Sequence, residues 1–427
     1  MNNYYSIPNK FNRYLILIFT VAPFVAYISI TYLDMSFNRI MQLLSYIGVI
    51  LVLLFKDKNS KIKFPKYLLF YLFFIFYVFF STFVLLDREF KIMYLFSNSL
   101  IGGFNMMFII ENIKISKKYY YTILNISKNI LIIAVVVIII QQILNPYFFV
   151  RTDLIGEDDI NDLTERLPSI YSWVGGLTMG LGFVPVFILI VEELDKRKKK
   201  IIIWIIAGIL FAFLTKARWV LLNALLVLVI LFVNHKNKAL KFVKFALFTP
   251  ILFGAIIVSL DFSGINATGI LKERILETDK KNISQTTAGT RILALYALNE
   301  FFWDNPVLGK GDIKYGMGGT GKQDYKLRKF LGGRSSQIHV GYASLLYIFG
   351  LVGALFFLSF LILILKKLYN TGKTLGVWAP FLGFLGFALA NLTLVYFRVF
   401  EMGLIIVLVA DKYYNQNLNL KMKRIDK

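Results

Sequence analysis

Cysteine is absent from the 427-residue chain, and histidine occurs only twice. Without cysteine the chain can form neither a disulfide nor a thiolate metal site, so the sequence gives no information about its redox compartment. No other group of residues in the sequence suggests a cluster of metal ligands. We therefore expect no metal and no other cofactor.

Acidic residues are scarce: 25 Asp and Glu stand against 48 Lys and Arg, which gives a formal net charge of +23. Such an excess could indicate nucleic-acid binding, but the basic residues lie between apolar runs. Hydrophobic residues make up 57% of the chain and the mean hydropathy is +0.65, whereas globular domains are about 45–50% apolar. The sequence therefore predicts a membrane protein and no nucleic-acid partner.

The apolar residues form runs of about 15–22 residues, the length that crosses about 30 Å of hydrocarbon as a helix. The short alternating segments of a membrane barrel are missing. We predict an all-α polytopic integral membrane protein with about twelve transmembrane helices. The predicted spans are 14–33, 37–55, 67–86, 93–110, 130–144, 170–191, 201–214, 219–233, 247–260, 340–365, 375–395 and 397–410.

The charged loops alternate along the chain. If the N-terminus is inside, every inside segment is basic, as in 56–66 and 196–200, while the acidic stretch 157–165 lies outside. The positive-inside rule then predicts an inner (plasma) membrane protein with both termini in the cytoplasm and basic loops suited to anionic lipid. The first run, 14–33, could be a signal peptide, but we expect a retained anchor because another span follows at once.

One predicted outer segment, 261–339, is about eighty residues long, and connections of more than about 15 residues are usually functional or disordered. It divides the chain into a membrane domain at 1–260, this extracytoplasmic loop, and a second membrane domain with a cytoplasmic tail at 340–427. Within the loop, residues 290–303 predict a helix at the membrane interface, with Thr290 as its N-cap. Asn305-Pro306 and the glycines that follow predict its end.

Two short spans, 201–214 and 219–233, would be only about 21–23 Å long as helices. The hairpin between them should therefore be recessed in the outer leaflet together with Lys216 and Arg218. A cation held there tends to line a wet cavity or to meet an anion, although both side chains could instead reach the headgroups. The last predicted span, 397–410, is also short, so Arg398 should lie within the membrane. There it could contact substrate or pair with Glu401.

Two candidate residues belong to the long loop. Arg291 follows the predicted cap Thr290. A cation is unfavourable at a helix N-terminus, which is itself partially positive, unless the cation and the helix N-terminus bind an anion together. A phosphate site is one interpretation, and an exposed arginine in a loop is the other. His339 lies where the loop meets the span 340–365, and it is either a general base or a structural histidine.

Several short elements follow one another in a characteristic order between residues 166 and 401. They are Arg166-Leu167-Pro168, Leu214-Thr215-Lys216-Ala217-Arg218, Gly289-Thr290-Arg291, Asn305-Pro306-Val307-Leu308-Gly309-Lys310-Gly311, Gln337-Ile338-His339 and Gly350-Leu351-Val352-Gly353. In this order they resemble the O-antigen polymerases and O-antigen ligases, which are metal-independent membrane glycosyltransferases of the GT-C type. That family often has Asn directly after the histidine, whereas Val340 follows His339 here.

The resemblance implies an inverting glycosyl transfer at the outer face of the membrane. Arg218 and Arg291 would hold the pyrophosphate of an undecaprenyl-linked glycan, and His339 would activate the acceptor hydroxyl. Further substrate contacts are expected from Arg166, Lys216 and Arg398. The partners implied are the lipid-linked glycan, the bilayer, and possible contacts with the flippase and the chain-length regulator of the same pathway.

Three functions remain open on the sequence. A polymerase, which extends lipid-linked repeat units of an O-antigen or capsular polysaccharide, is the interpretation that we favour. An O-antigen ligase would use the same donor but transfer the glycan to the lipid A core. A lipid-linked glycan flippase belongs to another class, and its polar site would be expected near the bilayer midplane rather than toward the outer side.

Overall fold

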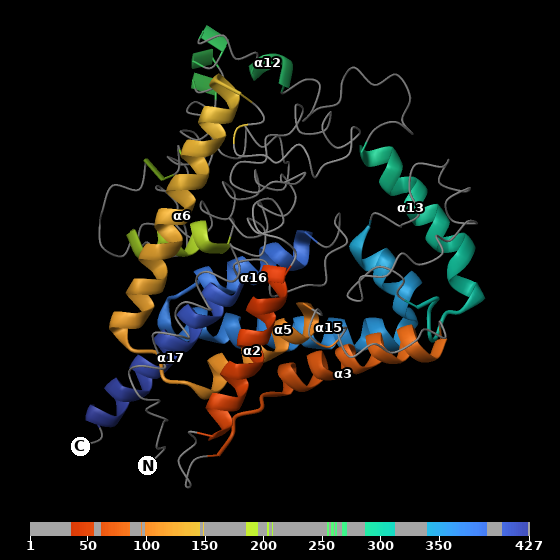
Figure 1. Ribbon diagram of the computed structural model, residues 1–427, viewed down its shortest axis with the longest axis horizontal. Helices are drawn as coiled ribbons and strands as arrows, with labels where there is room; N and C mark the ends of the chain where they lie inside the picture. Colours follow the sequence, from red (N-terminus) through yellow and green to blue (C-terminus); the bar gives the residue numbers. More distant parts are fainter. Residues whose placement is uncertain are drawn as a thin grey trace.

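The computed structural model describes residues 36–54, 61–85, 95, 99–145, 148, 185–194, 203–204, 207, 254–255, 258–259, 261–262, 267–270, 287–311, 340–390 and 404–425. Within these ranges the regular structure is helical and contains no strand (Figure 1). The named elements are α2 (Ser36–Leu54), α3 (Lys66–Phe80), a π-helical turn η1 (Ser81–Leu85), α5 (Ser99–Asn112), α6 (Lys117–Ile143), α12 (Ala267–Ile270), α13 (Thr287–Phe301), a 3₁₀ turn η5 (Phe302–Asp304), α15 (Gly341–Leu375), α16 (Ala379–Ala390) and α17 (Leu404–Ile425).

Three helices in the described part of the chain are long and apolar enough to cross a membrane. They are Lys66–Val84, Lys117–Ile143 and Gly341–Leu375. Two shorter apolar helices cover Leu43–Leu54 and Ala379–Leu389. The predicted all-helical membrane fold is confirmed for these residues, while the count of about twelve spans stays a prediction.

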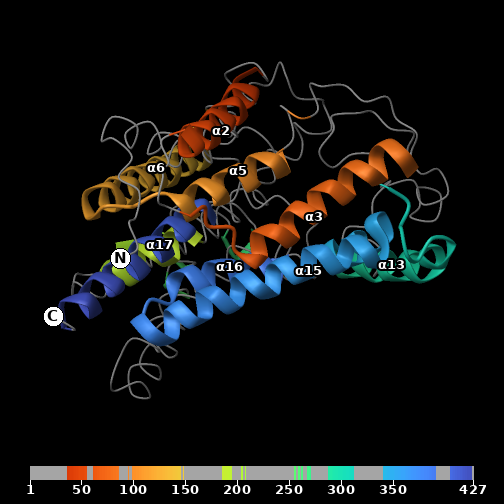
Figure 2. The same cartoon turned by 90° about the horizontal axis from the view of Figure 1, so that it is seen from below.

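Helices α3 and α15 form the most extensive helix pair, and Figure 2 shows them side by side. Aromatic rings fill their interface: the ring centroids of Tyr71 and Phe360 are 4.7 Å apart, and those of Phe74 and Phe357 are 5.1 Å apart. Tyr67 lies near Phe360 and Tyr77 near Phe356, so the two helices run antiparallel. Such ring pairs add attraction beyond burial, which matters where lipid supplies no hydrophobic driving force.

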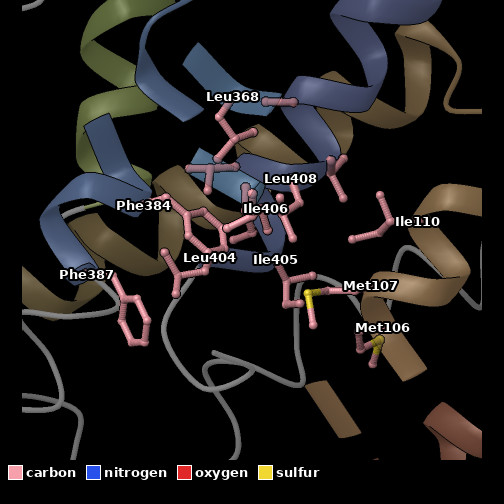
Figure 3. Close-up of a cluster of buried hydrophobic side chains, with 14 of the residues drawn as sticks. Met106, Met107, Ile110, Leu368, Phe384, Phe387, Leu404, Ile405, Ile406 and Leu408 are labelled. Carbon is pink, nitrogen blue, oxygen red and sulfur yellow. The ribbon is translucent and has the colours of Figure 1, made fainter. Parts of the chain in front are cut away.

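The start of α17 is the centre of a second packed region. Leu404, Ile405, Ile406 and Leu408 are fully or almost fully buried. Figure 3 shows them among side chains of three other helices, namely Phe384 and Phe387 of α16, Leu368 of α15, and Met106, Met107 and Ile110 of α5. This segment is therefore enclosed by protein on several sides, which fits a helix in the interior of a bundle.

The N-terminus of α16 is held by an acidic residue from a distant part of the chain. The Glu192 carboxylate, in the helix over 185–194, accepts hydrogen bonds from the main-chain N–H groups of Trp378 and Ala379, both at 2.8 Å. These are among the N–H groups that a helix cannot satisfy internally. Glu192 therefore fixes one helix against the other.

Two predicted spans underestimate the length of their helices. Helix α6 begins at Lys117, not near residue 130, with Ser116 as its N-cap accepting from the Tyr119 N–H at 3.3 Å. Tyr120, Ile123, Leu124 and Ser127 are buried along its polar first half. Likewise, α17 continues to Ile425 although its apolar run ends near residue 410. Hydropathy detects only the apolar part of such helices, whereas burial follows the 3.6-residue period.

The predicted spans 340–365 and 375–395 also differ from the structure. Helix α15 extends to Leu375 but is broken at Gly350, where φ is 60° and ψ is −165°. It ends at Gly376, whose φ of 66° is the left-handed conformation of a helix C-cap. Because of this cap, α16 begins only at Ala379. The predicted span from residue 340 is therefore present as a helix long and apolar enough to cross a membrane, but it is longer than predicted and is interrupted at Gly350.

Candidate functional site

The break in α15 is filled by the segment 306–311 of the long loop. A broken helix leaves main-chain carbonyl and N–H groups without helical partners, and in a membrane these groups must be satisfied by protein. Four main-chain hydrogen bonds join the segment to the break: Lys310 N–H to Tyr347 O (3.1 Å), Gly311 N–H to Ile348 O (2.8 Å), Leu351 N–H to Pro306 O (2.9 Å) and Val352 N–H to Val307 O (3.2 Å). The segment therefore replaces the missing turn of the helix.

Side chains reinforce this junction from two directions. The Tyr77 hydroxyl of α3 donates a hydrogen bond to the Leu308 carbonyl oxygen at 2.6 Å. The Lys310 ammonium lies 5.2 Å from the ring centroid of Phe301 and 5.3 Å from that of Tyr347, and 3.2 Å from a carboxylate oxygen of Asp304. Cation–π contacts of this kind are favourable where water is partly excluded. Through Leu308 and Lys310, the segment 306–311 thus contacts α3, the end of α13 and α15.

Helix α13 packs along the first part of α15, and Figure 1 shows it beside the light-blue start of that helix. Ala294 and Ala297 of α13 are buried against Val340, Ala343 and Tyr347. The small alanine side chains let two helix backbones approach closely. This packing places a described part of the long loop against the beginning of α15, at residue 340.

Arg291 lies on the side of α13 that faces α15. It precedes Ala294 by three residues and Leu298 by seven, a spacing that puts all three on one helix face. Its side chain is half-buried. Helix α13 begins at Thr287, so Thr290 is inside the helix and the prediction that it is the N-cap was wrong. Residue type does not decide where the helix starts, because the stretch 286–290 contains three threonines and threonine is a favoured cap.

This correction changes the expected chemistry of Arg291. The helix N-terminus and the guanidinium do not lie next to each other, since Arg291 comes after the first turn of α13. The predicted shared anion site of helix N-terminus and arginine therefore loses its geometric basis. What remains is a half-buried arginine at a position on the same helix face as Ala294, which packs on α15.

Arg291 is the one predicted site residue that falls in the described part of the chain. His339 directly precedes Val340, which is buried against α13. His339 itself, together with Arg218, Lys216, Arg166 and Arg398, lies outside the described residues. Their roles stay predictions, as does their grouping with Arg291.

A charged cluster that the sequence analysis missed lies at the other end of α15. Glu111 of α5 accepts a hydrogen bond from the Tyr67 hydroxyl at 2.7 Å and forms an ion pair with Lys367. Lys367 also lies 3.2 Å from Asp411 Oδ2, and Lys412 donates to the Glu111 carbonyl oxygen at 2.8 Å. The lysines were interpreted only as topology signals, and acidic residues at the inner ends of the spans were the signal that could have shown the cluster.

Metal binding has no support among the described residues, where no three His, Cys, Asp or Glu side chains are grouped so as to hold an ion. The described site instead consists of a helical membrane scaffold, a long loop seated in a broken helix, and an arginine beside that helix. These features define a helical membrane protein in which part of a long loop is packed against a broken helix.

Comparison with known protein families shows which family of membrane proteins the chain resembles. Residues 201–358 match the family model described as O-antigen ligase, which confirms the predicted resemblance to the O-antigen polymerase and ligase superfamily. The matched range contains Lys216, Arg218, Arg291 and His339. Arg166 and Arg398 lie outside it. No curated protein matches the chain. The match supports an enzyme of the glycosyltransferase type that acts in a membrane.

Proposed function

We propose that this protein polymerises undecaprenyl-pyrophosphate-linked oligosaccharide repeat units at the outer face of the plasma membrane. The observation that carries the proposal is the family match over 201–358, combined with the packing of the Arg291-bearing helix against Val340. Helix α13, which carries the predicted catalytic residue Arg291, therefore packs against Val340, and Val340 directly follows the predicted catalytic residue His339 in the chain. The proposed topology has both termini in the cytoplasm and the reaction on the opposite side.

The proposed reaction is an inverting transfer. The acceptor hydroxyl oxygen forms a bond to the anomeric carbon of the donor, and the bond from that carbon to the pyrophosphate oxygen breaks on the opposite face of the sugar. His339 takes the hydroxyl proton. The leaving lipid pyrophosphate carries the electron pair, so its negative charge grows as the bond breaks. Arg218 and Arg291 would stabilise that charge, since a guanidinium binds phosphate oxygens bidentately and stays protonated.

An O-antigen ligase is the second candidate, and the name of the matching family, O-antigen ligase, favours it. Ligase and polymerase would share donor, leaving group and general base, and would differ only in the acceptor. The polymerase acceptor is the terminal sugar of another lipid-linked unit, whereas the ligase acceptor is a sugar of the lipid A core. The flippase alternative places its polar site near the midplane, whereas the recessed charges that we predict lie toward the outer side.

The two enzymes can be separated with purified full-length protein. We would incubate it with a lipid-pyrophosphate-linked repeat unit, with and without lipid A core, and analyse the glycans by gel and the released lipid pyrophosphate by mass spectrometry. A ladder formed without lipid A core supports the polymerase. Product formed only with lipid A core supports the ligase. No product and no released pyrophosphate in either reaction would reject both enzymes.

The arginine provides a specific control for that assay. Arg291→Ala should remove the product, whereas Asn299→Ala, on the exposed side of the same helix, should retain it. Equal loss in both variants would point to a general requirement for α13 rather than to the guanidinium. Both proteins would first be compared for membrane insertion and yield.

A further inference from the structure

A cavity of about 520 Å³ opens at the end of the bundle where α3 begins and α5 and α15 end. Its lining includes the Glu111 cluster, since Glu111, Lys367, Asp411 and Lys412 all border it. It lies far from the long loop: Lys367 follows the Gly350 break by about 25 Å along α15 at 1.5 Å per residue. The cavity is therefore separate from the proposed glycosyl-transfer site.

The inner wall of the cavity is buried and charged. Asp411 is fully buried, Lys412 is 6% exposed and Glu111 is 9% exposed. The carboxylate of Glu111 is paired with Lys367 and lies 3.8 Å from the Lys412 ammonium, while Asp411 faces Lys367. Buried charges in this setting need partners, and these four residues largely neutralise one another.

Two further lysines make the cavity positive as a whole. Lys63 and Lys366 also line it and are both exposed. Four lysines against two carboxylates leave a net charge of two positive. The main chain of Lys63 is fixed by Asn112, which accepts from the Lys63 N–H at 2.8 Å and donates to the Lys63 carbonyl at 3.0 Å. The cavity thus has two exposed lysines at its rim, and the charged residues at its buried end largely neutralise one another.

An apolar stripe on α15 leads to this rim. Leu355, Leu358 and Ile362 are exposed and follow one another at helical spacing, and Lys366 continues the same row four residues later. Leu363 contributes an apolar patch to the cavity wall itself. The arrangement matches an amphiphile, with an acyl chain along the stripe and an anionic headgroup at the lysines.

We propose that this cavity is a binding site for a phosphate group, carried either by an anionic phospholipid headgroup or by a soluble phosphate. The rim supplies two ammonium groups for the phosphate oxygens. Behind them the charges of Lys367 and Lys412 are balanced by Glu111 and Asp411, so the net positive charge of the cavity comes from the rim. The predicted topology places this end of the helices at the cytoplasmic surface, where anionic lipids concentrate. The adjacent apolar stripe favours the lipid as the source of the phosphate.

The proposal can be tested on the full-length protein in a neutral detergent. Phosphatidylglycerol, phosphatidylcholine and inorganic phosphate would be added separately, and binding would be followed by thermal stabilisation and by native mass spectrometry. We expect phosphatidylglycerol to raise the melting temperature by several degrees and phosphatidylcholine to have little effect. The double variant Lys63→Gln/Lys366→Gln should bind phosphatidylglycerol about 25-fold more weakly, the product of about fivefold for each lysine.

The matched control is Lys373→Gln, an exposed lysine near the end of the same helix that does not line the cavity. It should bind phosphatidylglycerol like the wild type, which separates the cavity from general surface charge. Stabilisation by inorganic phosphate, lost in the double variant, would support the site and assign it to a soluble ligand. The proposal is overturned if neither anion stabilises the wild type, or if the double variant and Lys373→Gln bind equally well.

Discussion

Gly309 and Gly350 lie so close together that neither position has room for a Cβ atom. A Cβ on Gly309 would be 2.4 Å from both the Gly350 nitrogen and the Ile348 oxygen. One on Gly350 would be 2.4 Å from the Val307 oxygen and 2.5 Å from the Gly309 nitrogen. Both residues also have positive φ, 72° and 60°. This pair of glycines forms the joint between the long loop and the broken helix.

Alanine at either glycine should therefore destabilise the joint. Gly376→Ala is the control, because Gly376 also has positive φ but nothing lies within 4 Å of its Cβ position. That control should cost only the left-handed strain, about 1–2 kcal/mol. Gly309→Ala and Gly350→Ala add a clash with main-chain atoms, so their melting temperatures in detergent should fall clearly below that of Gly376→Ala. Equal losses in all three would mean that the close approach does not exist.

Tyr77→Phe tests the link between α3 and the loop. It removes the hydrogen bond to the Leu308 carbonyl while keeping the ring, and one such bond typically contributes about 1 kcal/mol. The main-chain amides of Lys310 and Gly311 should then exchange with deuterium faster than in the wild type. Tyr296→Phe is the control, since Tyr296 is 63% exposed on α13. Unchanged exchange in Tyr77→Phe would show that the main-chain bonds alone hold the loop.

The sequence predicted those structural elements that a short local pattern of residues is sufficient to specify. Helix α13 was predicted from its apolar run and from Asn305-Pro306 with the two glycines after it, and its start was wrong by three residues. The break at Gly350 was not predictable, because a glycine in an apolar run does not reveal positive φ. The break becomes favourable only through hydrogen bonds to a segment distant in the sequence. Likewise, the position of Glu111 at the end of a predicted span could have indicated a charged cluster, but it does not show that Lys367 and Lys412 are its partners.

In the candidate site, too, local sequence patterns predicted some features, whereas features that depend on long-range packing were not predicted. The order of short motifs was enough to predict the resemblance to the family whose model matches residues 201–358. It also selected Arg291, which shares a helix face with Ala294, a residue of α13 that packs on α15. The local prediction of a Thr290 cap failed. The convergence of Arg291 with Arg218 and His339 depends on long-range packing that no local pattern encodes, and it stays a prediction.

Glu111→Gln should destabilise the protein strongly. The change removes the negative charge between Lys367 and Lys412 and leaves two cations with less compensation in a mostly buried cluster. Breaking a buried pair in this way costs about 3 kcal/mol or more. The double variant Glu111→Gln/Lys412→Met should be less destabilised than the sum of the single variants, because the residues interact. Thermal unfolding would measure both, and strict additivity would argue against the coupling.

Glu192→Ala tests the cap of α16. Both oxygens of Glu192 accept main-chain hydrogen bonds from the start of that helix, so alanine leaves two N–H groups without their acceptor. We expect a loss of about 2 kcal/mol, at the upper end for a helix cap, because Glu192 is 1% exposed. Glu192→Gln retains one acceptor oxygen and should lose less. Glu300→Ala, an exposed carboxylate on α13, should leave the melting temperature unchanged.

Arg291→Ala should reduce polymer synthesis without impairing membrane insertion. If its guanidinium stabilises the leaving pyrophosphate, removing it should lower the rate by about 10²–10³-fold, the range measured for single groups that stabilise developing charge. Arg291→Lys keeps the charge but loses the bidentate geometry, so its rate should be intermediate. A merely structural arginine would be rescued equally by any long side chain, such as Arg291→Met, because only packing would matter.

The same assay extends to the two other predicted catalytic residues. Arg218→Ala and His339→Ala should each abolish long glycan chains, and a combination of either with Arg291→Ala should cost much less than the product of the single effects, since catalytic residues that act as a unit are not additive. His339→Ala should also remove the acidic limb of the pH–rate profile, because a histidine base must be neutral to accept the hydroxyl proton. Full-length polymer from a well-expressed variant of any one residue would remove that residue from the mechanism.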